Sequence, residues 1–350
     1  MTVEEKYMHR CLELARSGSG NVAPNPMVGA VLVYEDRIIG EGYHKEYGKA
    51  HAEVNCVNSV SDEDRKFISS SALYVSLEPC SHYGKTPPCT NLIIKEKIPK
   101  VVVGCRDPFK EVAGKGIEKL RSAGVDVTVD ILERECKELN KRFLTFHTQH
   151  RPYIILKWAQ TTNGKIGNTS NERLFITNEF TNRLVHKWRS EEMGILVGTN
   201  TAFLDNPELT NRLWNGKSPI RLIVDLHLRL PSSLKIFDAQ QPTVVFNTLH
   251  HKEEEKIKYY QVTEDVSIVH QILNACYQNN IQSIIVEGGA RLLQAFIDEG
   301  IWDEARIITN ETLHVENGLP SPQLSNCTFV SSENIFSDRI DYYYNKSYSF

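Results

Sequence analysis

The residues with the clearest chemical potential are one histidine, one glutamate and two cysteines in the first third of the chain. His51 and Glu53 are separated by one residue, and Cys80 and Cys89 follow with eight residues between them. One imidazole and two thiolates form a three-ligand set for Zn²⁺ that leaves the fourth tetrahedral position open, as in catalytic zinc sites. A glutamate two residues beyond the ligand histidine can take a proton from an activated water and deliver it to a leaving amine.

Alternating strand and helix patterns surround these residues. Apolar runs predict strands at 28–34, 72–77 and 101–103, and helical spacing predicts helices at about 52–60, 89–97, 114–123 and 131–146. A further helix near the N-terminus carries its apolar residues on one face, namely Tyr7, Met8, Cys11, Leu12 and Ala15. The alternation predicts a mainly parallel sheet with helices on both faces.

In this arrangement the candidate ligands lie at the ends of elements. His51 and Glu53 open one helix, Cys80 follows a strand, and Cys89 begins another helix. The partial positive charge at a helix N-terminus lowers the pKa of a thiol and favours the thiolate that zinc requires. The cysteines at 11, 56, 136, 276 and 327 lack such partners and are interpreted as packing residues, whereas Cys105 follows a strand and remains ambiguous.

Length and composition limit the possible classes of protein. The 350 residues suggest two domains, and eight cysteines are too few for a disulfide scaffold of this length, which favours the reducing cytoplasm. No apolar run is long enough to span a membrane. The first 150 residues hold 21 basic and 21 acidic side chains, and the remainder hold 19 and 23. Neither half has the positive excess typical of nucleic-acid binding, so we expect no nucleic-acid partner.

A domain boundary is predicted where the helical pattern ends before Pro152. Beyond it the pattern is again α/β, with strands at 153–158, 195–198, 221–225, 243–246, 283–286 and 305–309 and helices near 178–191, 267–279 and 290–299. The charged run Lys252–Lys258 is interpreted as the solvated face of a helix. An apolar strand turns through Gly288 and Gly289 into a helix, and such a turn can hold a phosphate on its backbone N–H groups.

The first half resembles a known family of enzymes. His-Ala-Glu followed by Pro-Cys is the signature of zinc nucleobase and nucleoside deaminases. The longer form Glu-Pro-Cys-Ser-His-x-Gly-x-Thr-Pro-Pro-Cys at 78–89, with Pro24-Asn25-Pro26 and Gly42-Tyr43-His44, resembles the bifunctional deaminase/reductase family of riboflavin biosynthesis. That resemblance implies a cytidine-deaminase-like three-layer α/β/α domain over residues 1–147, with one Zn²⁺ held by His51, Cys80 and Cys89 and with Glu53 as the catalytic acid and base.

The family's substrate is a diaminopyrimidinone that carries a phosphoribosylamino arm. The resemblance assigns contacts with this substrate to five residues: Asn25, His44, His82, Lys85 and Asp107. Asn25 would read the edge of the ring, and His82 and Lys85 would suit the phosphate and ribose.

The second half resembles the reductase part of the same family, on Lys157-x-Ala159, Phe175-Ile176-Thr177 and Val286-Glu287-Gly288-Gly289. The resemblance implies a dihydrofolate-reductase-like α/β domain over residues 151–350 that uses NADPH. Contacts with the dinucleotide would come from Ala159, Phe175, Thr201, Asp205, Gly289, Ala290, Arg291, Leu292 and Leu293. The phosphoribosyl substrate would be held by Arg189, Leu209, Arg212 and Glu287, because guanidinium groups bind phosphate oxygens bidentately.

The resulting hypothesis is a cytoplasmic, homo-oligomeric enzyme that deaminates 2,5-diamino-6-(5-phosphoribosylamino)pyrimidin-4(3H)-one and then reduces the ribosyl arm. The preference between NADPH and NADH stays open. One alternative is a deaminase with a catalytically silent C-terminal binding or dimerisation module, because Arg173, Phe175 and Leu226 depart from the family pattern. Another is a deaminase of RNA or DNA bases, which predicts a two-residue cysteine spacing and a basic chain, and the sequence has neither.

Overall fold

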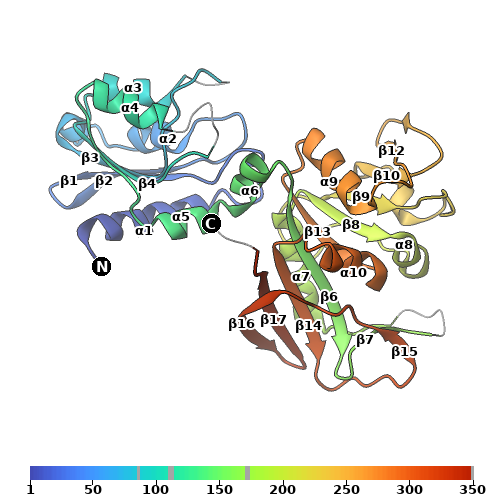
Figure 1. The fold of residues 1–350 in the computed structure, drawn as a ribbon. Coiled ribbons are helices and arrows are strands. Elements are labelled where there is room, and N and C mark those ends of the chain that lie inside the picture. Colours follow the sequence, from blue (N-terminus) through green and yellow to red (C-terminus); the bar gives the residue numbers. More distant parts are fainter. Residues whose placement is uncertain (85–86, 109–113, 170–173, 348–350) are drawn as a thin grey trace. The chain divides into compact units, whose positions relative to one another are not determined.

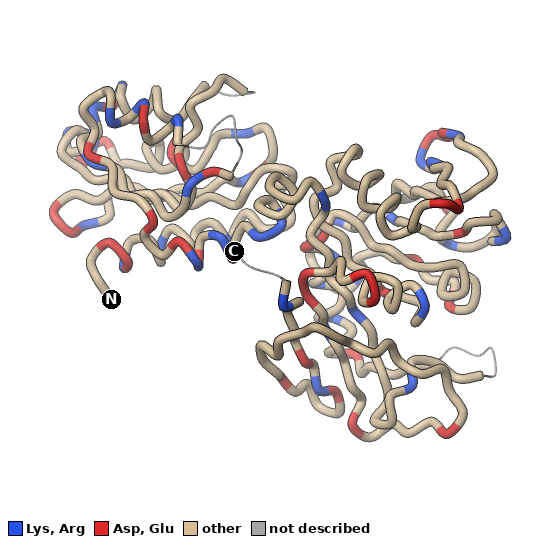
Figure 2. The backbone as a smooth tube through the Cα atoms, viewed as in Figure 1, with Lys and Arg blue, Asp and Glu red and all other residues tan. Residues whose placement is uncertain are grey.

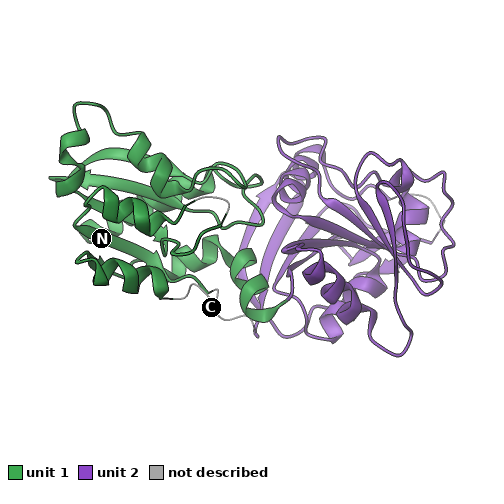
Figure 3. Ribbon diagram, turned by 90° about the horizontal axis from the view of Figure 1, so that it is seen from above, with its two compact units in different colours: residues 1–150, 350 green, residues 151–349 purple. Residues whose placement is uncertain are grey.

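A computed structural model describes residues 1–84, 87–108, 114–169 and 174–347 of the chain. It divides into two compact units, residues 1–150 and residues 151–349 (Figure 3). The last helix before the division ends at Gln149, His150 is left-handed, and Pro152 prevents the helix from continuing.

Unit 1 is a five-stranded sheet with helices on both faces (Figure 1). Its strands are β1 (Gly29–Tyr34), β2 (Arg37–Tyr43), β3 (Ala72–Leu77), β4 (Lys100–Cys105) and β5 (Asp126–Thr128). Its helices are α1 (Val3–Arg16), α2 (Ala52–Asn58), α3 (Cys89–Lys95), α4 (Lys115–Ser122), α5 (Glu133–Leu139) and α6 (Lys141–Gln149), with a 3₁₀ helix at Arg65–Ser70.

The alternation of side chains along the buried strands separates two apolar cores. In β1, Ala30 and Leu32 pack with α2, α3 and α4, whereas Val31 and Val33 pack with α1 and α5 on the opposite face. The five apolar residues predicted to share one face of the first helix are all buried in α1, which confirms that prediction. The three-layer arrangement expected for this half is therefore present.

Two details of the prediction for this half are wrong. The sheet is mixed, because β1 is antiparallel to both β2 and β3, and only β3, β4 and β5 are parallel. The helix predicted at 131–146 is two helices that meet at Asn140. The buried Asn140 accepts a hydrogen bond from the Met27 N–H at 2.8 Å and donates one to the Met27 carbonyl at 2.9 Å. These two hydrogen bonds stabilise a break in the helix at Asn140. The spacing of apolar residues alone does not predict this break.

Unit 2 contains a ten-stranded sheet in the order β11-β12-β10-β9-β8-β13-β6-β14-β17-β16 and a separate pair, β7 and β15. Its strands are β6 (Tyr153–Thr161), β7 (Lys165–Asn168), β8 (Gly194–Gly198), β9 (Ile220–Val224), β10 (Thr243–Asn247), β11 (Lys252–Glu253), β12 (Ile257–Gln261), β13 (Ser283–Gly288), β14 (Glu304–Asn310), β15 (Gly318–Pro320), β16 (Cys327–Ile335) and β17 (Asp338–Asn345). Its helices are α7 (Glu179–Glu191), α8 (Thr199–Asp205), α9 (Ile268–Gln278) and α10 (Ala290–Asp298), with a 3₁₀ helix at Lys235–Phe237.

The strands from β12 to β14 along this sheet are parallel, and the edge strands β11, β17 and β16 are antiparallel to their neighbours. Helices α9 and α10 cover one face and α7 and α8 the other (Figure 1). The α/β class predicted for both halves is confirmed. The parallel strands bring their carboxyl ends to one edge, where ligands of open α/β sheets bind.

The interpretation of Lys252–Lys258 as a helix face is wrong. These residues form β11, a bend and the start of β12, and β12 pairs in parallel with β10. Their charged side chains can lie on an exposed sheet edge as easily as on a helix, so charge alone does not separate the two. The sequence analysis also did not predict β16 and β17. Most of β16 is exposed and lacks an apolar alternation.

Acidic and basic side chains are interspersed along both units (Figure 2). Within the described residues, none of the helices combines the length and the apolar character needed to cross a membrane.

Candidate active sites

The structure brings the three predicted ligands of unit 1 together. His51 directly precedes α2, Cys80 follows β3, and Cys89 is the first residue of α3. Their ligand atoms all lie within 4.8 Å of one another, and His51 Nδ1 is 3.6 Å from Cys80 Sγ and 3.4 Å from Cys89 Sγ. One imidazole nitrogen and two sulfurs that converge in this way fit a tetrahedral Zn²⁺ with one open position.

The local backbone explains how these ligands reach one place. Gly42 of β2 lets α2 pack closely, because a Cβ atom there would lie 2.2 Å from the Cys56 nitrogen. The backbone N–H of Cys89 donates to Cys80 Sγ at 3.3 Å. Hydrogen bonds from Cys89 and His51 outweigh burial and lower the pKa of Cys80 to about 4, which favours the thiolate.

Glu53 lies in the first turn of α2, next to this cluster, and only 3% of its surface is exposed. Burial, with a smaller contribution from the negative charge of Cys80, raises the pKa of its carboxyl group to about 7. A carboxyl group with this pKa can both accept and release a proton near neutral pH, which is the requirement for general acid and base chemistry.

The predicted substrate residues Asn25 and His44 contact each other beside the candidate metal ligands. Asn25 Nδ2 lies 3.1 Å from His44 Nε2, and the His44 ring packs edge-on against His51 with 5.3 Å between ring centroids. Burial lowers the pKa of His44. Asp107 follows β4 and is partly exposed, His82 is exposed in the loop after Cys80, and Lys85 lies outside the described residues.

Glu78 is a structural residue of this site to which the sequence analysis assigned no role. Its buried carboxylate accepts hydrogen bonds from the backbone N–H groups of Asp107, Gly114, Gly116 and Ile117 at 2.9–3.3 Å. It thereby attaches the start of α4 and the segment containing Asp107 to the strand end that carries Cys80. Its position two residues before Cys80 was the available signal.

In unit 2, the predicted substrate residues Arg189 and Glu287 form a buried ion cluster with Lys157. Arg189 of α7 makes a bidentate pair with Glu287 at 2.7 and 2.8 Å, and Lys157 Nζ lies 3.2 Å from the same carboxylate. Burial alone would raise the pKa of Glu287, but the two cations outweigh it and lower the pKa to about 2. The sequence analysis quoted Lys157 in a motif and assigned it no role.

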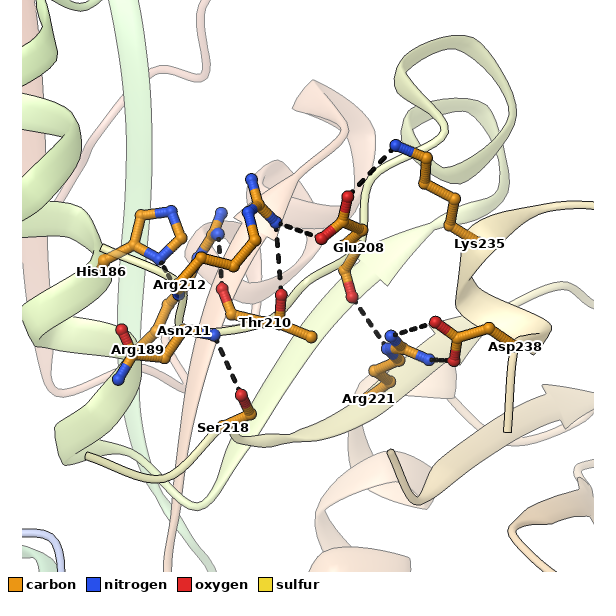
Figure 4. A network of polar contacts seen from close by, with 10 residues as sticks. All are labelled: His186, Arg189, Glu208, Thr210, Asn211, Arg212, Ser218, Arg221, Lys235 and Asp238. Carbon is orange, nitrogen blue, oxygen red and sulfur yellow. Dashed lines mark hydrogen bonds and ion pairs between the residues drawn. The ribbon is translucent and has the colours of Figure 1, made fainter. Parts of the chain in front are cut away.

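The other two predicted substrate residues lie on one loop, residues 206–212, between α8 and β9. Leu209 is buried in the apolar core and has a left-handed backbone, so only its main chain is available to a ligand. Arg212 is exposed, and its guanidinium group binds Glu208 at 2.9 Å (Figure 4). Lys235 binds the other oxygen of the Glu208 carboxylate at 3.2 Å.

Side chains from α7 and β9 hold the backbone of this loop (Figure 4). His186 Nδ1 accepts a hydrogen bond from the Arg212 N–H at 2.9 Å, and Arg189 donates to the Thr210 carbonyl at 3.3 Å. The buried Arg221 donates to the Glu208 carbonyl at 2.9 Å and pairs with Asp238. Burial, reinforced by Arg189 and Arg212, lowers the pKa of His186 to about 4.

Apart from Phe175, the predicted dinucleotide residues lie near or beyond the carboxyl ends of three neighbouring strands, β6, β13 and β8. Thr201 in α8 packs against the turn after β13, where a Cβ atom on Gly288 would lie 2.8 Å from the Thr201 side chain. The side chain of Leu293 is 1% exposed and belongs to the core, so only its backbone could contact a ligand. The remaining positions are Ala159 near the end of β6, Asp205 at the end of α8, Gly289–Leu292 at the start of α10, and the exposed Phe175 before α7.

Comparisons with known proteins agree with two catalytic domains. Residues 1–105 match the family described as the cytidine and deoxycytidylate deaminase zinc-binding region. Residues 152–313 match the family described as the RibD C-terminal domain. The first match contains the metal-ligand cluster, and the second contains the Lys157–Arg189–Glu287 cluster.

Full-length relatives match across both units. The chain is 41% identical to riboflavin biosynthesis protein RibD of Aquifex aeolicus, over 86% of this chain and 85% of that protein. It is 39% identical to the RibD of Bacillus amyloliquefaciens, over 86% and 83%. Among solved structures, a diaminohydroxyphosphoribosylaminopyrimidine deaminase/5-amino-6-(5-phosphoribosylamino)uracil reductase from Thermotoga maritima has a TM-score of 0.86 and 34% identity, with 98% and 99% of the two chains covered. The RibD of Acinetobacter baumannii has a TM-score of 0.89 and 28% identity, with 98% of both chains covered. The chain therefore belongs to the RibD family of riboflavin biosynthesis proteins, which combine a deaminase domain and a reductase domain.

Proposed function

We propose that this chain deaminates 2,5-diamino-6-(5-phosphoribosylamino)pyrimidin-4(3H)-one and then reduces the ribosyl arm of the product to give 5-amino-6-(5-phosphoribitylamino)uracil. The observation that carries this proposal is the convergence of His51, Cys80 and Cys89 beside a buried Glu53 in a chain of the RibD family. The activities named for the Thermotoga relative support the choice of substrate.

In unit 1, His51 Nδ1 and the sulfurs of Cys80 and Cys89 hold one Zn²⁺ in this proposal. When bound, the ion supplies Lewis acidity that lowers the pKa of a water molecule. Glu53 accepts the proton of that water as it attacks the amino-bearing ring carbon, and the same carboxyl group protonates the departing ammonia. The raised pKa of Glu53 supports both steps.

The substrate of unit 1 is held by Asn25, His44, His82, Lys85 and Asp107 in this proposal. Asn25 and His44 stand beside the metal ligands and suit the flat ring, whereas His82 lies in an exposed loop that suits the phosphate and ribose. Glu78 keeps the segment of Asp107 next to Cys80 through its hydrogen bonds to backbone N–H groups.

In unit 2, the substrate is held by Arg189, Leu209, Arg212 and Glu287, with Leu209 acting through its main chain. The cofactor is NADPH, which supplies the hydride when it is bound. Ala159, Phe175, Thr201, Asp205 and the start of α10 at Gly289–Leu293 surround it in this proposal. The close packing of Thr201 against Gly288, at the carboxyl ends of β8 and β13, supports a cofactor site at this edge.

We further propose that the enzyme acts in the cytoplasm as a homo-oligomer, with a deaminase domain at 1–147 and a reductase domain at 151–350. The division of the structure after His150 supports a boundary in this region.

Metal analysis of the purified chain, combined with assays of both steps, tests the proposal. We expect one Zn²⁺ per chain, ammonia release from the diaminopyrimidine phosphoriboside, and loss of NADPH absorbance with the deaminated product. Ammonia release without NADPH oxidation would favour a silent C-terminal module instead. Absence of both reactions in a zinc-loaded protein would refute the proposal.

A further inference from the structure

The two arginines assigned to the substrate of unit 2 are paired with carboxylates of very different exposure. Arg189 binds Glu287 in the buried cluster, where the two side chains are 14% and 5% exposed. Arg212 binds Glu208 at 2.9 Å, and these side chains are 50% and 34% exposed. Breaking a buried pair leaves an uncompensated charge, whereas water replaces the partner in an exposed pair. Arg212 can therefore exchange its carboxylate for a ligand at a much lower cost than Arg189.

The backbone around the Arg212–Glu208 pair is held in place, so an exchange has to occur in the side chains. His186 accepts a hydrogen bond from the Arg212 N–H at 2.9 Å, and the buried Arg221 donates to the Glu208 carbonyl at 2.9 Å. The guanidinium group of Arg212 binds Glu208 and Thr210 Oγ1, the latter at 3.2 Å. Rotation of the half-exposed Arg212 side chain breaks both of these contacts and leaves the two backbone contacts intact.

Lys235 allows Glu208 to lose Arg212 without becoming an unpaired anion. The carboxylate of Glu208 lies between two cations (Figure 4), because Arg212 binds Oε2 and Lys235 Nζ lies 3.2 Å from Oε1. The hydrogen bond with Lys235, aided by the charge of Arg212, lowers the pKa of Glu208, so the group is ionised at neutral pH. When Arg212 turns towards a ligand, the ion pair between Glu208 and Lys235 remains.

A carboxylate and a phosphate bind a guanidinium group in the same way, since each presents two oxygens to its parallel N–H groups. We propose that Glu208 occupies Arg212 while the site is empty and that the phosphate group of the substrate takes Arg212 from it. Glu208 is thus an internal competitor that sets the affinity of unit 2 for the phosphorylated arm. The inference rests on the proposed function for the assignment of Arg212 to the phosphoribosyl substrate.

Removal of the competing charge should tighten binding. Glu208→Gln keeps the size of the side chain but cannot neutralise Arg212. We expect it to lower the dissociation constant of ribose 5-phosphate, measured by calorimetry on the full-length chain, by about 3–10-fold. The KM of the deaminated substrate in the reduction assay should fall by a similar factor, and the KM of its dephosphorylated form should not change. Unchanged or weaker binding of ribose 5-phosphate to Glu208→Gln would overturn the proposal.

Arg212→Met separates competition for Arg212 from a general effect of charge. Unit 1 also takes a phosphoribosyl compound in the proposed function, so the part of ribose 5-phosphate binding that Arg212→Met weakens is assigned to unit 2. The double variant Glu208→Gln/Arg212→Met should match Arg212→Met within about twofold, because the group for which Glu208 competes is absent. Clearly tighter binding by the double variant would show general repulsion by Glu208 and would contradict the competition.

Glu311→Gln is the matched control. It breaks another exposed arginine–glutamate pair of unit 2, Arg339–Glu311 at 2.9 Å, and should leave the binding of ribose 5-phosphate unchanged. An equal gain in affinity for Glu311→Gln would attribute the effect to net charge and would count against the proposal. A chain in which Glu208→Gln tightens ribose 5-phosphate binding, but which does not oxidise NADPH with the deaminated substrate, would refute the proposed function and leave the competition for Arg212 supported.

Discussion

Unit 1 and unit 2 each place a glutamate in a site from which water is nearly excluded, and the two carboxyl groups titrate in opposite directions. Glu53 and Glu287 are similarly buried, at 3% exposure for the residue and 5% for the side chain, respectively. Burial raises the pKa of Glu53 to about 7, whereas Arg189 and Lys157 overcome burial and lower that of Glu287 to about 2. The two pKa values differ because the surroundings of the carboxyl groups differ, since the residue type is the same.

The difference follows from where the chemistry originates in each site. In the function proposed above, side chains of unit 1 hold the metal and transfer the proton, so one carboxyl group must change its charge. In unit 2 of the same proposal, the nicotinamide carries out the hydride transfer, and the protein has to supply fixed charges at fixed positions. A permanently ionised Glu287 between two cations meets that requirement.

Cys80→Ser should give the largest separation between the units. Loss of one thiolate from a three-ligand set should remove the zinc and abolish ammonia release, while reduction of the already deaminated substrate is unchanged. Zinc content by elemental analysis and the two activity assays check this. Cys327→Ser in β16 is the control and should retain zinc. An equal fall in both activities for Cys80→Ser would show that the sites are not independent.

Glu53→Gln should come next in magnitude. The amide keeps the shape of the side chain but cannot carry the proton, so we expect ammonia release to fall by about 10²–10⁴-fold with the zinc retained. Single-turnover ammonia assays with parallel metal analysis measure this. Glu63→Gln, at an exposed position, should leave the rate unchanged. If the zinc were lost from Glu53→Gln, the fall in rate would not report proton transfer.

Glu287→Gln should affect stability as well as reduction. The variant leaves Arg189 and Lys157 buried without their carboxylate, which we expect to lower the unfolding free energy of unit 2 by about 3–5 kcal/mol. All four tryptophans lie beyond residue 150, so their fluorescence during urea denaturation reports unit 2 selectively. Glu191→Gln breaks the more exposed Lys187–Glu191 pair of α7 and should cost less than about 1 kcal/mol. Equal costs would contradict the buried cluster.

The smallest predicted effect is the pH dependence of the stability that Glu287→Gln loses. The pKa of Glu287 is about 2 in the folded protein and 4.5 ordinarily, so the unfolded chain takes up this proton first as the pH falls. The stabilisation by Glu287 is then complete above about pH 5 and declines between pH 4.5 and pH 2. The difference in unfolding free energy between the wild type and Glu287→Gln should therefore shrink between pH 6 and pH 3. A constant difference would be inconsistent with a lowered pKa.

The convergence of the three candidate metal ligands was predictable because residue type and position agreed. His51, Cys80 and Cys89 are uncommon ligand types, and each was expected at the end of an element, where their convergence follows from the sheet topology. The role of Glu78 was not predictable in the same way. Within the described residues, the Glu78 carboxylate accepts hydrogen bonds only from backbone N–H groups, and residues of almost any type have such a group. The identity of its partners therefore cannot be recognised from the sequence.

Breaks and edges were the least predictable parts of the fold. Asn140 interrupts an apolar pattern that is continuous from 131 to 146, and its partner Met27 is more than one hundred residues away. Lys252–Lys258 carries charges that suit a helix and an edge strand equally well. The ion cluster of unit 2 joins three segments that are far apart in the sequence, at Lys157, Arg189 and Glu287. Their contact therefore depends on the fold and could not be predicted from the sequence.

Among the described residues, each unit is one continuous segment of the chain, and the two meet between His150 and Arg151. The boundary therefore corresponds to a single position in the gene. A stop codon there and a new start codon after it would yield two polypeptides with one catalytic centre each. Co-expression of the two fragments would then show whether cells need the deaminase and the reductase to be tethered, or only to be present together.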